Sequence, residues 1–295
     1  MLALAVVAGA CAGSGGSGGG AGESGGGGSE EVDRLYQEGL SWAKRAEAAP
    51  LPTPDPATVA GGSGGAFAAA PEFKPEELRA VESFEKALSA HPNHAGANLA
   101  LGDLLAPHAL RRLEAQRARD AAAKGRPRKG QARDAAVTLV PVSTVDASPE
   151  RVIRVYQAAL QADPGRTPAD RLISFAVPAG RLDAAEAAHH ELLLRVKERA
   201  EPYALYGDFL AMQKKDLDGA IDQYRQALIW KPDDEDTRRK LADIHLTRGV
   251  EYYGRQEFTR AVIEFKESEK YVTDRDSEQG RRLQTYLTRM KEIRR

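Results

Sequence analysis

The chain has 295 residues and a formal net charge of −1 at pH 7, with 42% hydrophobic and 29% charged residues, which is typical of a soluble chain that folds. Only 6% of the residues are aromatic and runs of β-branched residues are few, so we expect almost no β-sheet. Cys11 is the single cysteine, which excludes an internal disulfide framework.

The N-terminal residues 1–11, MLALAVVAGAC, are apolar up to the cysteine. This stretch is too short to cross a membrane as a helix, but it has the length of a signal-peptide core. Small residues at 8–10 before Cys11 resemble the lipobox of bacterial lipoproteins, and the resemblance implies that the thiol is lipidated and becomes the first residue after cleavage. Ala12, in place of Asp, is similar to lipoproteins sent on to the outer membrane. The alternative is an apolar terminus with a chance cysteine.

A flexible tether is predicted for residues 12–29, because eleven of the sixteen residues 13–28 are Gly. A helix over 30–48 follows. The Pro- and Gly-rich residues 49–71 cannot form a packed element of that length, so we expect a disordered loop between the two helices of a first pair. The residues of the helix that point toward its partner are Leu35, Gly39 and Trp42.

One pattern recurs along the rest of the chain: an aromatic residue, Ala-Leu after two more residues, and Pro four residues after the Leu. It occurs in FEKALSAHP at 84–92, YQAALQADP at 156–164 and YRQALIWKP at 224–232. Such spacing places the three apolar residues on one face of a helix that the Pro ends. A weaker copy and a fifth copy supply Ala185, His189, Leu192, Ala261, Phe265 and Ser268.

The copy with His189 lies 33 residues after Tyr156 and 35 before Tyr224. A period near 34 of helix–turn–helix units indicates a helical solenoid. The residues resemble the tetratricopeptide repeat (TPR) family, in which a small residue on the first helix of a pair lets the second helix touch it. Four glycines match that position, and the unit with Leu172 and Ile173 lacks one. The glycines are Gly39, Gly102, Gly207 and Gly249.

The predicted fold is therefore all-α: a TPR-like α-solenoid of antiparallel helix pairs over residues 30–295, with about five repeats, a C-terminal capping helix and a disordered N-terminal tail. Ser148 before Pro149 indicates a capped helix start, and Thr167 is expected to cap the next helix with Asp170 reaching back. The capping helix presents Leu283, Leu287 and Met290 at helical spacing.

A second insertion covers residues 106–149 and is basic: nine Lys or Arg lie between residues 111 and 134 against three acids. Such a block suits phosphate, an anionic lipid surface or an acidic protein. Nucleic acid is disfavoured because no aromatic residue is interleaved to stack on bases. The alternative is a solvated, partly helical extension. The basic residues are Arg111, Arg112, Arg117, Arg119, Lys124, Arg126, Arg128, Lys129 and Arg133.

Catalytic and metal-binding patterns are absent from the sequence. His189 and His190 are adjacent, so on a helix they diverge by about 100° and do not share a metal. No nucleophile elbow, Walker-type loop or zinc-protease motif occurs, and carboxylates fall on helix faces where basic residues pair with them. We therefore expect neither an enzyme nor a cofactor.

The remaining expectation is recognition in the concave groove that the first helices line. Its aspartates favour a basic or polar partner segment, and the alternative is that they keep this face soluble. Trp230 is either an exposed anchor or a core aromatic between repeats. The groove residues predicted from the register are Leu99, Asp103, Asp170, Ser174, Ala204, Asp208, Asp243, Leu246, Val250 and Tyr253.

These observations predict a non-enzymatic protein-interaction scaffold, lipid-anchored at Cys11 in the envelope of a Gram-negative bacterium, on the outer membrane and facing the periplasm. Among proteins of this build, assembly factors for outer-membrane machines such as pilus secretins are a comparison by architecture alone. The alternative is a cytoplasmic TPR adaptor or regulator whose basic insertion contacts nucleic acid or an acidic partner.

Overall fold

The computed structural model describes residues 26–49, 73–124, 145–196 and 199–293. The predicted signal peptide with Cys11, most of the tether and nearly all of the insertion at 49–71 lie outside these described residues. None of the described helices has the length and apolarity that crossing a membrane requires.

The described residues form helices and no strand. α8 continues as a short π-helical segment, η1 (Leu210–Lys214), which leads to the next helix. The other helices are α1 (Gly26–Ala48), α3 (Pro75–Ala90), α4 (Ala95–Lys124), α5 (Pro149–Ala162), α6 (Arg166–Ala179), α7 (Leu182–Arg195), α8 (Ala200–Phe209), α9 (Leu217–Trp230), α10 (Glu235–Gly254), α11 (Phe258–Tyr271) and α12 (Glu278–Ile293).

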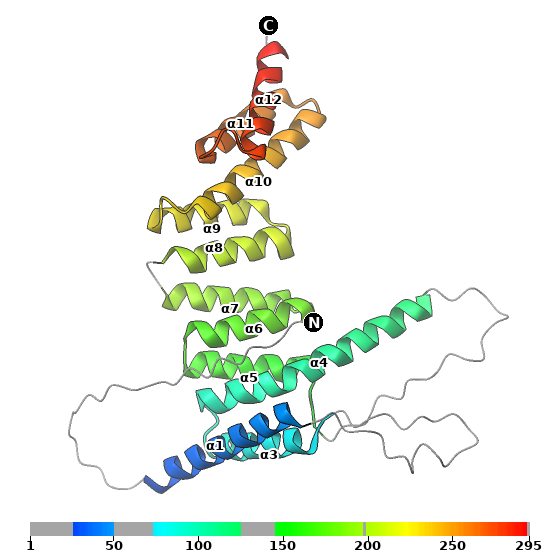
Figure 1. The fold of residues 1–295 in the computed structure, drawn as a ribbon, viewed down its shortest axis with the longest axis vertical. Helices are drawn as coiled ribbons and strands as arrows, with labels where there is room; N and C mark the ends of the chain where they lie inside the picture. Colours follow the sequence, from blue (N-terminus) through cyan, green and yellow to red (C-terminus); the bar gives the residue numbers. More distant parts are fainter. Residues whose placement is uncertain (1–25, 50–72, 125–144, 197–198, 294–295) are drawn as a thin grey trace, which may run out of the picture.

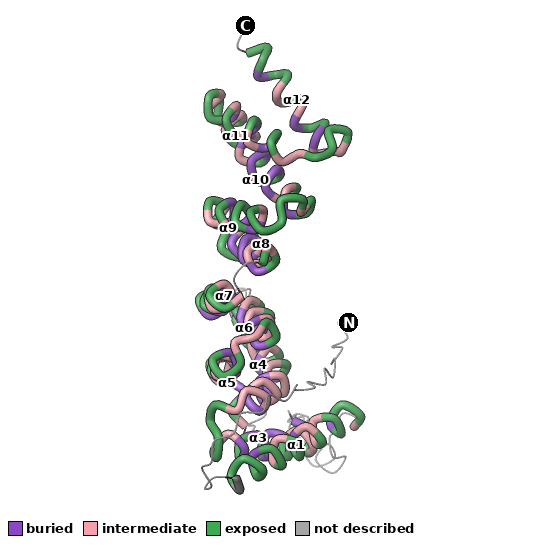
Figure 2. Tube along the Cα trace, turned by 90° about the vertical axis from the view of Figure 1, so that its left-hand side faces the viewer, coloured by how far each residue is buried: buried purple, intermediate pink, exposed green. Residues whose placement is uncertain are grey.

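Consecutive helices pack as antiparallel pairs, α1 with α3, α4 with α5, α6 with α7, α8 with α9 and α10 with α11, and the pairs stack into an elongated array (Figure 1). Buried residues occur along the whole length of the stack (Figure 2). At the last pair α12 covers the exposed end, with Leu283 and Met290 buried and Leu287 packed beside them. The predicted α-solenoid with a capping helix is confirmed.

Four pairs are held by an aromatic ring that lies directly on a backbone glycine of the partner helix. A Cβ atom added to Gly207 would lie 2.6 Å from Cε1 of Tyr224, well inside van der Waals contact. Gly39 meets Phe84, Gly102 meets Tyr156 and Gly249 meets Phe265 in the same way. Only glycine fits beneath these rings, which is why this residue marks the first helices in the sequence.

The third pair is built differently. Leu172 of α6 lies near the position of the missing glycine, and His189 of α7 takes the place of the ring; both side chains are buried. The pair thus forms without a ring-on-glycine contact between α6 and α7 among the described glycines.

The last pair departs from the regular spacing, because Phe265 follows Tyr224 by 41 residues (265 − 224) rather than about 34. The seven additional residues are two turns of α10, which has 20 residues. Ser268 of α11 donates a hydrogen bond of 2.8 Å to the backbone oxygen of Ala242, so α11 packs on the middle and end of α10. The first turns of α10 are thereby left for other contacts.

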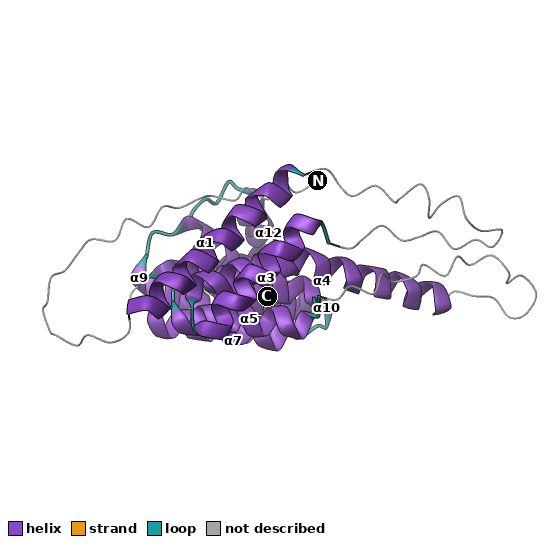
Figure 3. Cartoon of the chain, turned by 90° about the horizontal axis from the view of Figure 1, so that it is seen from below, coloured by secondary structure: helices purple, strands orange, loops and turns teal. Residues whose placement is uncertain are grey.

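Two sequence-based boundaries are wrong. α1 begins at Gly26, so the last four residues of the predicted tether are helical. α4 runs through Pro107 to Lys124, so the start of the basic insertion is helical, as the alternative of a partly helical extension predicted, and it prolongs α4 beyond the neighbouring pairs (Figures 1 and 3). The second wrong boundary is the start of α6. The N-cap of α6 is Gly165 rather than Thr167, and Asp170 pairs with Arg166 instead of reaching back. Ser148 does cap α5, as predicted, by accepting from the backbone nitrogen of Arg151.

The Gly207→Ala variant tests the ring-on-glycine contact. The added methyl group collides with Tyr224, so we expect the free energy of unfolding to fall by about 1–3 kcal/mol despite the better helix propensity of Ala. The matched control is Gly254→Ala at the end of α10, where nothing lies within 4 Å of the added atom. Denaturant unfolding followed by circular dichroism measures both; equal stability of the two variants would refute the contact.

Candidate functional site

The predicted groove residues lie on α4, α6, α8 and α10, the first helices of their pairs. Their exposure differs: Ser174 and Asp243 are exposed, Leu246 is buried, and the remaining seven are half-buried. A side chain as buried as that of Leu246, at 2% exposure, offers a partner little surface.

Asp208 lies deep in the wall of this face, where it joins two repeats. Its carboxylate accepts hydrogen bonds from the hydroxyl of Tyr224 at 2.7 Å and from Nζ of Lys240 at 2.9 Å. Tyr224 belongs to the same pair and Lys240 to the first helix of the next pair. Burial, followed by the Asp208 carboxylate, raises the pKa of Tyr224, so this hydroxyl keeps its proton and remains a donor.

Asp103 repeats this arrangement two pairs earlier. It accepts from the hydroxyl of Tyr156 at 2.9 Å and lies 3.4 Å from Nε of Arg171 on the first helix of the next pair. Burial raises the pKa of Asp103, although Arg171 and the Tyr156 hydroxyl oppose this shift. The carboxylate is thus compensated from both neighbouring helices.

The tyrosine that donates to each aspartate is the ring that packs on the glycine just before that aspartate. In the two pairs with a phenylalanine ring, the residue after the glycine is Leu40 or Val250, which needs no donor. We refer to Gly102-Asp103 with Tyr156 and to Gly207-Asp208 with Tyr224 as Gly-Asp/Tyr locks. In both locks the aspartate also pairs with a basic side chain of the following repeat, Arg171 or Lys240.

These contacts change the interpretation of the acidic groove. Asp103 and Asp208 are committed to the locks, and Asp170 lies 3.1 Å from Nε of Arg166. Asp243 is the exposed aspartate of the predicted set, and it accepts from Nε2 of Gln279 at 2.9 Å. The attraction of this face for a basic partner therefore rests less on these aspartates than the sequence suggested.

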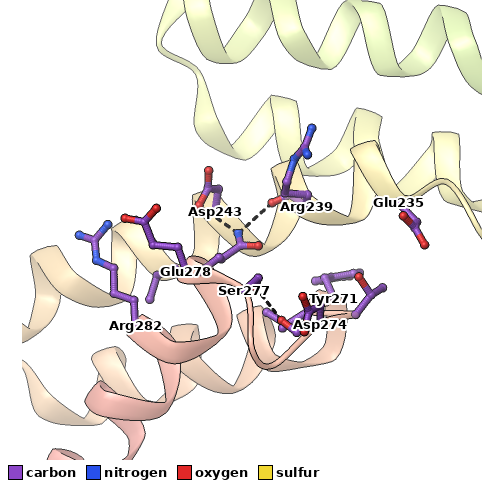
Figure 4. Close-up of a pocket in the computed structure, with 12 residues that line it drawn as sticks. Glu235, Arg239, Asp243, Tyr271, Asp274, Ser277, Glu278 and Arg282 are labelled. Carbon is purple, nitrogen blue, oxygen red and sulfur yellow. Dashed lines mark hydrogen bonds between the residues drawn. The ribbon is translucent and has the colours of Figure 1, made fainter.

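A hollow of about 500 Å³ lies beside Asp243, between α10 and the start of α12 (Figure 4). Its α10 wall is the row exposed by the two additional turns, and its other wall is the loop that leads into α12. Gln279 spans the two walls, since it also donates to the backbone oxygen of Arg239 at 3.1 Å. The lining comprises Glu235, Arg239, Asp243, Leu246, Tyr271, Val272, Thr273, Asp274, Ser277, Glu278, Gln279 and Arg282.

Sequence reasoning found only two of these lining residues, Asp243 and Leu246. The others come from the α11–α12 loop and from α12, which carry no repeat pattern. The one available signal was the spacing of 41 residues between Tyr224 and Phe265, which implies an overlong first helix. The position of α12 across that helix depends on tertiary packing.

A second hollow lies between α7 and α9, is also lined by Tyr203 of α8, and has a volume of about 740 Å³. Trp230 lines it and is 45% exposed, so this side chain is not the core aromatic that the sequence left open. Leu194, at 64% exposure, lies on the same hollow.

The described basic residues of α4 are partly used within the fold. Arg111 donates to the backbone oxygen of Pro107, Arg112 to that of Val145, and Arg117 to that of Pro178. Arg119 is exposed. The side chain of Lys124 and the residues Arg126, Arg128, Lys129 and Arg133 lie outside the description.

Within the described ranges, no group of three or more His, Cys, Asp or Glu side chains is placed to hold a metal ion. His189 is buried and His190 bonds to the hydroxyl of Tyr206, so the adjacent histidines point to different surroundings.

No family model matches the sequence, and no curated protein matches it. Among solved structures, the chain is similar to Pseudomonas aeruginosa PilF at 15% identity, covering 84% of this chain and 79% of that one, with a TM-score of 0.37. A MamA structure is 15% identical over 82% and 92% of the two chains at a TM-score of 0.40. YrrB, a TPR protein with an unusual peptide-binding site, is 16% identical over 68% and 79% at 0.34.

The chain is a TPR-like helical-repeat protein. This statement rests on the five stacked pairs and on the four ring-on-glycine contacts. The remote likenesses above add no information about what the array binds.

The Tyr224→Phe variant tests the Gly-Asp/Tyr lock. The ring stays on Gly207 while Asp208 loses one donor, so we expect the free energy of unfolding to fall by about 1–2 kcal/mol. In a double-mutant cycle with Asp208→Asn the two losses should not add. Tyr203→Phe on α8 is the control, because no hydrogen bond of its hydroxyl is present in the described structure and its removal should change little. Full additivity would show that the hydroxyl and the carboxylate act independently.

Proposed function

We propose that this protein is a non-enzymatic scaffold that binds a polypeptide segment along the face of its first helices. The observation that carries the proposal is the row of first helices α4, α6, α8 and α10, in which one lock joins α4 to α6 and the other joins α8 to α10. A stack of this kind presents a long, rigid surface suited to an extended segment or a partner helix.

The chemistry of the segment follows from the groups that remain exposed. The hollow beside Asp243 is lined by four carboxylates, from Glu235, Asp243, Asp274 and Glu278, and by two guanidinium groups. Arg239 is paired with Asp236 on its own helix, and this carboxylate offsets the positive charge of Arg239 at the hollow. We therefore propose that the partner is polar or basic where it reaches this end of the array.

The location of the scaffold is also a proposal. The lipobox-like sequence before Cys11 and the Gly-rich residues that follow support a lipid anchor with a tether, which would hold the array at the outer membrane facing the periplasm. A lipid anchor on a tether confines the array to the membrane surface without restricting its orientation.

Labelled palmitate tests the anchor. The protein, expressed with its native upstream region, should incorporate the label and fractionate with membranes, whereas a Cys11→Ser variant should do neither. Soluble, unlabelled wild-type protein would refute the anchor and favour the cytoplasmic adaptor.

Photocrosslinking tests the binding face independently of the anchor. A benzoylphenylalanine at Ala204 or Ser174, on the first helices, should capture one recurrent polypeptide in cells, and the same probe at Ile263 on α11 should not. Asp243→Lys should reduce the captured amount severalfold, because it reverses an exposed charge beside the hollow. Equal capture from all three probe positions would refute the groove as the binding face.

A further inference from the structure

The third helix pair carries an imidazole ring at a position where the other four pairs have a phenyl or phenol ring. His189 takes the place held by Phe84, Tyr156, Tyr224 and Phe265 in the other pairs. It lies 33 residues after Tyr156 and 35 before Tyr224, in register with both. An imidazole can gain a proton near neutral pH, which the phenyl and phenol rings do not do.

His189 is buried at the junction between the third and fourth pairs, with 4% of its surface exposed. Its ring lies against two rings of α8, with centroid distances of 5.3 Å to Tyr206 and 5.0 Å to Phe209. Neither ring nitrogen has a hydrogen-bond partner among the described residues. The site therefore suits a neutral ring and provides nothing to compensate an imidazolium.

The charged and titratable groups around the ring come from three elements. Glu186 and His190 lie on α7 itself, Tyr206 comes from α8, and Lys214 of η1 lies 2.8 Å from Glu186. The hydroxyl of Tyr206 lies 2.7 Å from Nε2 of His190 and donates to Glu186 at 3.2 Å. Glu186 is thus held by Lys214 and Tyr206. Gln223 of α9 and His190 line the same hollow between α7 and α9.

The balance of these groups opposes protonation. Burial lowers the pKa of His189 to about 4, with a smaller contribution from His190 in the same direction and an opposing one from Glu186. The ordinary histidine pKa of about 6.5 returns once the ring reaches water. Because the closed junction binds the proton more weakly than the open one, acid favours opening between about pH 6.5 and 4.

The other two buried histidines have carboxylates beside them. Nε2 of His108 lies 3.5 Å from Glu77, and Nδ1 of His245 lies 2.7 Å from Glu264. In both cases the carboxylate lies on a neighbouring helix. Among the described buried histidines, His189 is therefore the one with no carboxylate within bonding distance of its ring nitrogens.

We propose that the contact of α7 with α8 is an acid-sensitive joint, which opens when His189 is protonated and divides the array into α1–α7 and α8–α12. Opening would bend or break the row formed by α6 and α8, so the joint would release a partner that spans both halves. The joint is a property of the array itself and depends on neither the lipid anchor nor the identity of the partner.

Spin-label distances across the joint test this proposal on the full chain carrying Cys11→Ser. Labels are attached at Ser174→Cys on α6 and Met212→Cys on η1, both exposed. As the pH falls from 7.5 to 4.5, a second, longer distance should appear, and its population should rise by up to about tenfold per pH unit below pH 6.5. A pair at Ser89→Cys and Ser174→Cys, both on the N-terminal side of the joint, should keep one distance.

Variants separate the trigger from general acid effects. His189→Phe supplies the ring type of the other pairs and should abolish the longer distance, with His189→Leu as a second variant if the larger ring does not fit. His91→Gln, an exposed histidine, should leave the response unchanged. The proposal is overturned if the His189 variants open like the parent, if no second distance appears by pH 4.5, or if helicity measured by circular dichroism is lost together with the opening.

Discussion

The contact on which this structure depends is an aromatic ring lying on the bare backbone of a glycine. Two helices come this close only where one of them has no Cβ atom, and the ring of the other then fills the space that the missing side chain leaves. Repeated at Gly39, Gly102, Gly207 and Gly249, the contact fixes the depth and the register of four pairs. Stacking of the pairs follows, because each pair on its own leaves an apolar face uncovered.

The locks show how one choice of residue determines the next. Where the ring is a tyrosine, the residue after the glycine is an aspartate that accepts from the tyrosine hydroxyl; where the ring is a phenylalanine, the residue after the glycine is apolar. Each of these aspartates also pairs with a basic side chain on the first helix of the next pair, Arg171 or Lys240. Charges that seemed available to a partner are thus part of the coupling between repeats.

Features with a functional interpretation arise where the repeat is broken. Two additional turns in α10 displace α11 and leave a wall that the start of α12 completes into a hollow. In the third pair, a buried histidine takes the place of the phenyl or phenol ring and meets the rings of the next pair. Regular repeats provide a rigid frame, and the two departures from regularity provide a polar recess and a titratable junction.

The sequence by itself determined the helical class, the five pairs, the capping helix and the four glycine positions, because ring, small residue and proline recur at helical spacing and depend on local geometry. It also placed Asp103 and Asp208 on the first helices of their pairs. Only the tertiary structure decided that these carboxylates are bound by Tyr156 and Tyr224, that Gln279 reaches α10, and that the ring nitrogens of His189 have no hydrogen-bond partner among the described residues. Such contacts join residues of different helices, whose relative placement depends on how complete side chains pack, and no periodicity along the chain encodes it.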